Sequence, residues 1–197
     1  MAKVFLLSPA RVDGRRAQFL LNPKASFALA RQFQTTGATL AELFTFSSGL
    51  YFRGKIAYAR QFADLKQGDQ IRVITTNAGL VDPERVLTPA DLLAFQTAEI
   101  DETNPHYRKP LLRHSQALER TKPRVVLLGS IATAKYRDIL LECFGERLLF
   151  PSDFVGRGDM SRGALLLRAA RAGNELPYLA VQGAVLKGKR AQRVGKE

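Results

Sequence analysis

The chain has 197 residues, of which 46% are hydrophobic, and this suits a single domain with a substantial core. Its 30 Lys and Arg against 18 Asp and Glu give a formal net charge of +12, which favours a nucleic acid as partner; a basic enzyme with another substrate is the alternative. No apolar run approaches the ~20 residues of a membrane span, and a single cysteine excludes an internal disulfide, so we expect a cytoplasmic protein that does not engage membranes.

Short apolar segments alternate with segments of helical spacing along the chain. The opening MAKVFLLSPAR turns polar too soon for a secretory signal, and KVFLL within it predicts a buried strand. The predicted strands are 3–7, 70–75, 124–128 and 147–150, with 177–180 as a further candidate. The predicted helices are 22–33, 54–65, one that begins at Thr88-Pro89, 105–120, 131–144 and 160–172.

Several residues mark the ends of these helices. Asn22 and Thr88 each precede a proline and are expected to cap a helix, and Asp91 in the first turn suits the helix dipole. Asp159 is expected to cap the helix 160–172, and Gly173 to follow its end.

Continuous apolar strands separated by helices predict an α/β fold with a mainly parallel central sheet and helices on both faces. We expect this single domain to span residues 1–183 and the protein to be a monomer. Residues 184–197 form a basic tail, which is either an arm that contacts phosphates or a solvated terminus.

Ligands gather at the carboxyl ends of parallel strands, so the loops that follow the predicted strands are candidate sites. After the first strand, Asp13 lies among Arg11, Arg15 and Arg16; the arginines would bind phosphates and the carboxylate would position water, or the segment is a surface turn. After the second strand, Asn77 offers an amide that can read the edge of a base, or it simply forms a turn.

The loop that follows Pro151 is rich in glycine and arginine. Gly156 and Gly158 allow close backbone approach, while Arg157 and Arg162 offer donors to phosphate; the alternative is an ordinary helix-entry loop.

Aromatic, histidine and cysteine residues complete the candidates. Tyr51 and Phe52 follow a Ser/Gly-rich segment and either stack on an extruded base or pack in the core. His106 and His114 are expected to face solvent and Cys143 to lie in the core. Because no Cys/His cluster has zinc spacing, we expect neither a metal nor a cofactor.

In their order along the chain, these segments resemble the uracil-DNA glycosylase superfamily over about four-fifths of the sequence. Residues 8–16 match its water-activating loop, Tyr51 or Phe52 its stacking aromatic, and Asn77 at the end of ITTN its base-reading asparagine. VVLLGSIATAKY matches its Gly/Ala element, and Pro151-Ser152 its Pro-Ser loop. Two features differ: the first loop lacks Gly-x-Asp-Pro, and no histidine precedes Pro151.

Other resemblances overlap with this one. LLSPAR and SGLY are similar to segments of the YaaA-type peroxide-stress proteins, which are linked to DNA binding. The base-handling domains of archaeosine-type tRNA-modifying enzymes look similar too. Uncharacterised bacterial domains share a GLVDP-like segment, here 79–83, and an AxxYxxxL helix, here 132–140.

The main resemblance implies a uracil-DNA-glycosylase-like fold and a monofunctional DNA glycosylase. Such an enzyme would flip out a modified or damaged base, such as a hypermodified phage base in antiviral defence, and hydrolyse its N-glycosidic bond. Asp13 and Asn77 would be catalytic, and Tyr51 or Phe52 would stack on the base. The expected nucleic-acid-binding residues are Ser8, Arg11, Arg15, Arg53, Ser152, Arg157 and Arg162. The alternatives are a non-catalytic DNA- or RNA-binding protein of the stress-response type and an enzyme acting on free nucleosides.

Overall fold

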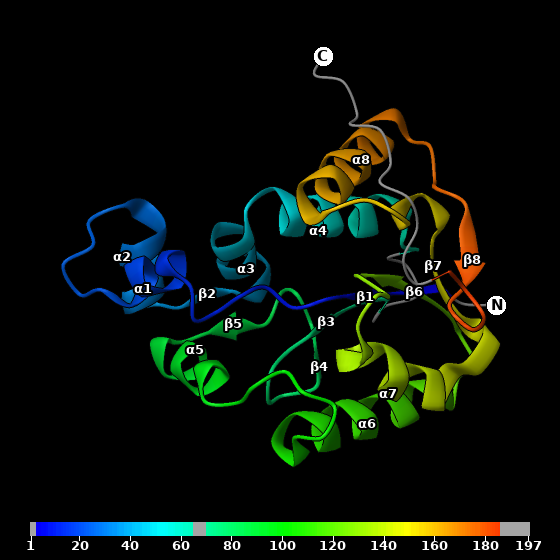
Figure 1. Ribbon diagram of the computed structural model, residues 1–197. Helices are drawn as coiled ribbons and strands as arrows, with labels where there is room; N and C mark the ends of the chain where they lie inside the picture. Colours follow the sequence, from blue (N-terminus) through cyan, green and yellow to red (C-terminus); the bar gives the residue numbers. More distant parts are fainter. Residues whose placement is uncertain (1–2, 65–69, 186–197) are drawn as a thin grey trace.

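A six-stranded sheet forms the centre of the α/β domain, which a computed structural model describes over residues 3–64 and 70–185 (Figure 1). Across the sheet, the strands are β4 (Leu80–Val81), β3 (Ile71–Ile74), β1 (Lys3–Leu7), β6 (Arg124–Leu128), β7 (Leu148–Pro151) and β8 (Tyr178–Ala180). The four central strands are parallel, and β4 and β8 join the two edges in antiparallel orientation. The predicted mainly parallel sheet is therefore confirmed.

Helices cover both faces of this sheet. Helices α4 (Leu50–Phe62) and α8 (Asp159–Ala172) lie on one face, and α6 (Pro105–Glu119) and α7 (Ala134–Phe144) lie on the other (Figure 1). The central strands β1 and β6 are buried along almost their whole length, because they pair with each other in full register and have helices above and below.

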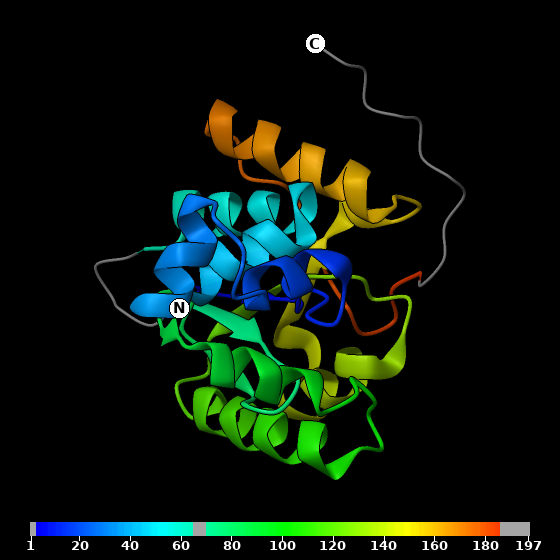
Figure 2. The same cartoon turned by 90° about the vertical axis from the view of Figure 1, so that its left-hand side faces the viewer.

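The remaining elements form a lobe beside the sheet (Figures 1 and 2). It consists of α1 (Arg15–Leu21), α2 (Ala28–Thr35), α3 (Leu40–Ser48) and α5 (Pro89–Gln96), with a small antiparallel pair of β2 (Ala38–Thr39) and β5 (Val86–Leu87). Strand β1 runs towards this lobe, so the lobe lies beyond the carboxyl ends of the parallel strands (Figure 1).

The connections of β1 and β6 run in opposite directions across the sheet. From β1 the chain passes through the lobe and α4 to β3 on one side, whereas from β6 it passes through α7 to β7 on the other side. The loops that leave these two neighbouring strands therefore diverge. In parallel sheets such a point is where ligands bind.

Two of the predicted helix caps are wrong. Asn22 does not cap a helix 22–33, because it closes α1, and its side-chain oxygen accepts a hydrogen bond from the backbone N–H of Lys24 at 2.9 Å. This local turn delays the next helix to Ala28. Asp159 is the first helical residue of α8 rather than its cap; Gly158 holds the cap position and offers no side chain.

The capping of α5 and the end of α8 agree with the prediction. The side chains of Thr88 and Asp91 each accept a hydrogen bond from the other's backbone N–H, which forms a capping box. Gly173 follows α8 with a φ of +66°. Of the predicted basic tail, residues 186–197 lie outside the described parts of the chain. None of the described helices has the length and apolar character needed to span a membrane.

Candidate functional site

The carboxyl ends of four parallel strands lie along one edge of the sheet. In spatial order, the segments that follow them are residues 75–79 after β3, 8–14 after β1, 129–133 after β6 and 152–158 after β7. We call this the carboxyl edge. It brings together three of the predicted site segments, which are far apart in the sequence.

The last turn of α5 fixes two of these loops. The Gln96 side chain donates a hydrogen bond to the carbonyl of Val12 at 2.7 Å, and the Asn77 side chain donates one to the carbonyl of Ala94 at 2.6 Å. The loop that carries Asp13 and the loop that carries Asn77 are thus attached to the same helix end.

Asp13 faces solvent and is paired with a neighbour. Its carboxylate accepts a hydrogen bond from Nε of Arg11 at 2.8 Å, and the two side chains are 62% and 79% exposed. This hydrogen bond lowers the pKa of Asp13 from its usual value. The carboxylate is therefore ionised at neutral pH, as a role in positioning water would require, and the pair sits where a ligand can reach it.

Asn77 lines a pocket, but with residues other than those predicted. The pocket has a volume of about 330 Å³ between the loop after β3 and α6, and its other lining residues are Pro105, His106, Lys109, Pro110 and Arg113. Neither Asp13 nor an aromatic side chain belongs to its walls. The structure thus brings the Asp13 and Asn77 loops to one helix end without enclosing both side chains in one pocket.

The predicted stacking aromatics are both buried. Phe52 has no exposed surface and Tyr51 is 7% exposed, so neither ring offers a face to a base in this conformation. The assignment of Phe52 as a stacking residue is wrong for this structure. Both residues lie on α4 and belong to the hydrophobic core.

A buried lysine lies beside these two rings. The ammonium nitrogen of Lys55 lies 4.5 Å from the centre of the Tyr51 ring and 4.9 Å from that of Phe52. It donates hydrogen bonds to the carbonyl and the hydroxyl of Ser8, at 2.6 and 2.9 Å. Lys55 has no exposed surface, and burial lowers its pKa to about 7.

Ser8 is therefore not a surface contact for phosphate. It is 5% exposed, and Lys55 ties both of its oxygens to α4. A Cβ at Gly129 would lie 2.8 Å from Cβ of Ser8 and 2.9 Å from the Tyr136 hydroxyl. Only a glycine fits between these groups, so β1 and β6 approach closely at the point where their connections diverge.

Two glycines allow α8 to cross directly over α4. A Cβ at Gly54 would lie 2.5 Å from the carbonyl oxygen of Gly163, and a Cβ at Gly163 would lie 2.8 Å from Cα of Tyr51. This contact places the start of α8 over the Tyr51–Lys55 turn. The Tyr51 hydroxyl is buried there without a hydrogen-bond partner among the described residues.

Arg157 in the loop after β7 and Arg162 in the first turns of α8 both brace that loop. Arg162 donates to the carbonyl of Phe154 from two guanidinium nitrogens, both at 3.3 Å, and its side chain is only 12% exposed. Arg157 donates to the carbonyl of Asp153 at 2.8 Å and to the Ser161 hydroxyl at 3.3 Å. The prediction of Arg162 as a phosphate contact is thus wrong for this conformation, because its donors serve the protein itself. The Ser152 hydroxyl donates to the carbonyl of Pro177 at 3.4 Å.

Exposed cations cluster instead on α1 and the start of α4. Arg16 donates to the carbonyl of Phe46 at 3.4 Å, which places it at the α3–α4 junction, one turn before Arg53. The Arg15 guanidinium lies 5.8 Å from the centre of the Phe19 ring, and Phe19 is 45% exposed. We define Arg15, Arg16, Phe19 and Arg53 as the α1 patch.

Phe19 is the residue that the sequence analysis missed. The signal was present, since Arg15 and Phe19 are four residues apart in RRAQFLL and meet on one face of a helix. No helix was predicted there, because Asn22-Pro23 was interpreted as the start of one.

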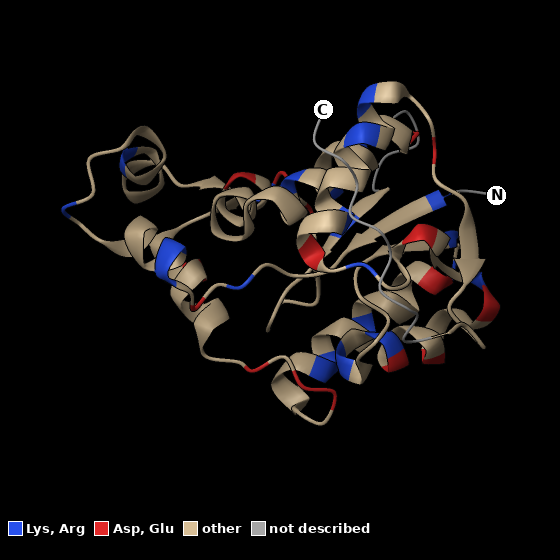
Figure 3. Cartoon of the chain, turned by 45° about the horizontal axis from the view of Figure 1, so that its top comes forward, with Lys and Arg blue, Asp and Glu red and all other residues tan. Residues whose placement is uncertain are grey.

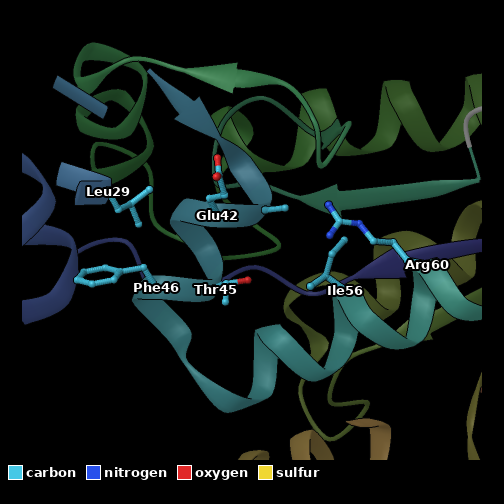
Figure 4. A pocket seen from close by; sticks show the side chains of 7 residues that line it. Leu29, Glu42, Thr45, Phe46, Ile56 and Arg60 are labelled. Atoms are coloured by element: carbon cyan, nitrogen blue, oxygen red, sulfur yellow. The ribbon is translucent and has the colours of Figure 1, made fainter. Parts of the chain in front are cut away.

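A second hollow lies on the lobe side of α4 (Figure 4). Its volume is about 390 Å³, and its lining is mainly apolar, with Leu29, Phe46 and Ile56 beside Glu42 and Arg60. Arg60 already pairs with Glu84. Within residues 3–64 and 70–185, no three His, Cys, Asp or Glu side chains are grouped so that they could hold a metal ion.

Comparisons with protein-family models, with curated proteins and with solved structures each found no match to this chain. The function is therefore inferred from the geometry of the chain itself.

Proposed function

We propose that the protein binds nucleic acid across the carboxyl edge and the α1 patch. The observation that carries this proposal is the state of three exposed guanidinium groups. Arg15 and Arg16 lie on α1 and Arg53 lies on α4, and none of the three forms an ion pair with a carboxylate in the described parts of the chain.

Many cations elsewhere on the molecule are neutralised locally. Arg108 pairs with Glu142 at 2.7 Å, and Arg72 with Asp82 at 3.0 Å. Basic residues are distributed over many elements rather than gathered on one (Figure 3). In the α1 patch the positive charges are left for an external anion, as a phosphate-binding surface requires, and they lie beside the exposed ring of Phe19.

Phe19 adds a second chemistry to this patch. An exposed ring among arginines can stack on an unpaired base while the guanidinium groups bind the backbone. This combination favours a single-stranded nucleic acid over a duplex, in which the faces of the bases are already stacked.

Salt-dependent binding tests the proposal. A fluorescent single-stranded oligonucleotide is titrated with the protein at several salt concentrations, and anisotropy gives the affinity. The Arg15→Gln/Arg53→Gln variant should bind more weakly, and the slope of log K against log salt should fall by about 1.4, or about 0.7 per lost phosphate contact.

The Lys122→Gln/Arg124→Gln variant is the matched control. It removes the same charge where β6 begins, at the amino ends of the parallel strands and thus opposite to the carboxyl edge, and both side chains are exposed. It should retain the wild-type slope. Absence of any salt-dependent binding by the wild-type protein, or an equal loss in both variants, would overturn the proposal.

DNA glycosylase activity is a second candidate, favoured by the attachment of the Asp13 and Asn77 loops to the end of α5. In this reaction the base leaves the sugar with the electrons of the N-glycosidic bond, water supplies a hydroxyl to the sugar carbon, and the proton of that water ends on the base. Asp13 would face the positive charge that develops on the sugar.

Alkali-induced strand breaks test this second candidate. DNAs that carry uracil, oxidised, alkylated or glucosylated bases are incubated with the protein and then treated with alkali, which cleaves abasic sites. Breaks with one of these substrates, lost in Asp13→Asn, are the expected result. No breaks with any substrate, or full activity in Asp13→Asn, would exclude the mechanism.

A further inference from the structure

The pocket beside Asn77 has basic walls that come from one helix. His106, Lys109 and Arg113 lie on α6 at positions i, i+3 and i+7, so their side chains project from the same face. Asn77 closes the pocket from the loop after β3. No carboxylate belongs to the lining.

The charges in this pocket are not neutralised by the protein. Lys109 and Arg113 are exposed, and neither forms an ion pair with any described residue; the one contact of Arg113 is with the His114 ring at 3.4 Å. Arg108, their neighbour on α6, is paired instead, because its guanidinium donates to both carboxylate oxygens of Glu142. The lysine and the arginine that line the pocket are therefore available to an anionic ligand.

Asn77 contributes a neutral group of fixed orientation. One N–H of its amide donates to the carbonyl of Ala94, which fixes the orientation of the side chain and leaves its oxygen able to accept a hydrogen bond from a ligand. A ligand that combines negative oxygens with a hydrogen-bond donor meets both needs. A nucleotide unit has this combination, since it carries a phosphate together with sugar hydroxyl or base N–H groups.

Direct backbone contact makes the floor of the pocket rigid. A Cβ at Gly79, whose φ is +67°, would lie 2.5 Å from the carbonyl oxygen of Pro110. Nδ1 of His114 lies 3.2 Å from both the backbone nitrogen and the carbonyl oxygen of Leu80, although the sequence had suggested a solvent-facing histidine. The loop of Asn77 and the helix of Lys109 thus keep a constant separation.

We infer that this pocket binds a backbone phosphate of the nucleic acid, through Lys109 and Arg113, and leads the strand from the carboxyl edge onto α6. The inference rests on the proposed function, since the same bound strand is held by the α1 patch.

The same anisotropy titration with a single-stranded oligonucleotide tests the pocket. Lys109→Gln/Arg113→Gln should lower the slope of log K against log salt by about 1.4, as two lost phosphate contacts predict. Lys122→Gln/Arg124→Gln, with the same change of charge, should leave the slope unchanged. Because Lys109 and Arg113 are exposed and form no ion pair, their replacement leaves the fold intact.

The outcomes separate the two proposals. If Arg15→Gln/Arg53→Gln weakens binding while Lys109→Gln/Arg113→Gln retains the wild-type slope, nucleic-acid binding stands and the phosphate site on α6 is refuted. If the wild-type protein does not bind the oligonucleotide, both proposals fail. A shortened oligonucleotide that contacts only the α1 patch should lose the sensitivity to Lys109 and Arg113; retained sensitivity would contradict the proposed path.

Discussion

Lys55 is an ionisable residue that the protein holds in its core without an ion pair. Taking an ammonium group out of water is costly, and the hydroxyl and carbonyl of Ser8 with two aromatic faces replace only part of its hydration. The residue connects α4 to the end of β1, so it holds in place the first residue of the loop that carries Asp13. This role is positioning rather than contact with a ligand.

Removal of this amine should change how stability depends on pH. The pKa of Lys55 is about 7 in the folded protein against an ordinary 10.5, so above pH 7 the unfolded chain binds one proton more than the folded one. The free energy of unfolding should therefore rise with pH, by about 1.4 kcal/mol per unit between pH 7 and 9. Lys55→Met should lack this contribution, which urea denaturation at several pH values would measure.

The unfolding free energies of wild type and Lys55→Met are compared only below pH 9, because above that pH the titration of a buried tyrosine lowers stability as pH rises. Burial raises the pKa of Tyr58 to about 12, so beyond pH 10 the unfolded chain loses a proton that the folded one keeps, and stability falls. If the free energy of unfolding changed with pH by the same amount in wild type and in Lys55→Met over pH 7–9, the buried amine would not titrate in that range.

At the scale of helices and strands, the sequence predicts best where a local signal decides the structure. RVVLL forms β6 over the whole predicted range, because the four consecutive apolar residues after Arg124 suit a strand buried on both faces. Thr88 begins α5 through a capping box that involves only residues three apart.

Contacts distant in sequence account for what the sequence could not predict. Tyr51 and Phe52 are buried beside Lys55, which bonds to Ser8, 47 residues earlier. Arg162 precedes Gly163, where α8 crosses α4, and its guanidinium donates to the carbonyl of Phe154 instead of facing solvent. Spacing along the chain identified the carboxyl edge as the location of the candidate site, but it could not show which of the side chains there are exposed.

The crossing of α4 and α8 provides a test at this scale. In Gly163→Ala the new methyl group would lie 2.8 Å from Cα of Tyr51 and from the carbonyl of Leu50, so the helices must separate. We expect a loss of about 1–3 kcal/mol in the free energy of unfolding, measured with urea. Gly158→Ala, where a Cβ meets nothing within 4 Å, is the control; it should cost less than Gly163→Ala, about 0.5–1 kcal/mol, because alanine is a weaker N-cap than glycine. Equal stability of the two variants would contradict the close crossing.

For the whole molecule, the proposed binding surface extends over parts that the sheet holds together. The α1 patch belongs to the lobe, the Asp13 loop leaves the centre of the sheet, and Lys109 and Arg113 lie on a helix that covers one face (Figure 2). A net charge of +12 attracts any polyanion over distances of the Debye length, so affinity alone does not reveal which form of nucleic acid is preferred.

Phe19 is expected to supply that preference. Because a single strand has bases free to stack and a duplex does not, Phe19→Ala should weaken binding of a single-stranded oligonucleotide about tenfold and leave duplex affinity unchanged. Leu179→Ala removes another exposed apolar side chain, on the edge strand β8, and should change neither affinity. Anisotropy with matched single-stranded and duplex probes at one salt concentration measures both. An equal loss for the two probes would mean that Phe19 supports the fold of α1 rather than stacking on a base.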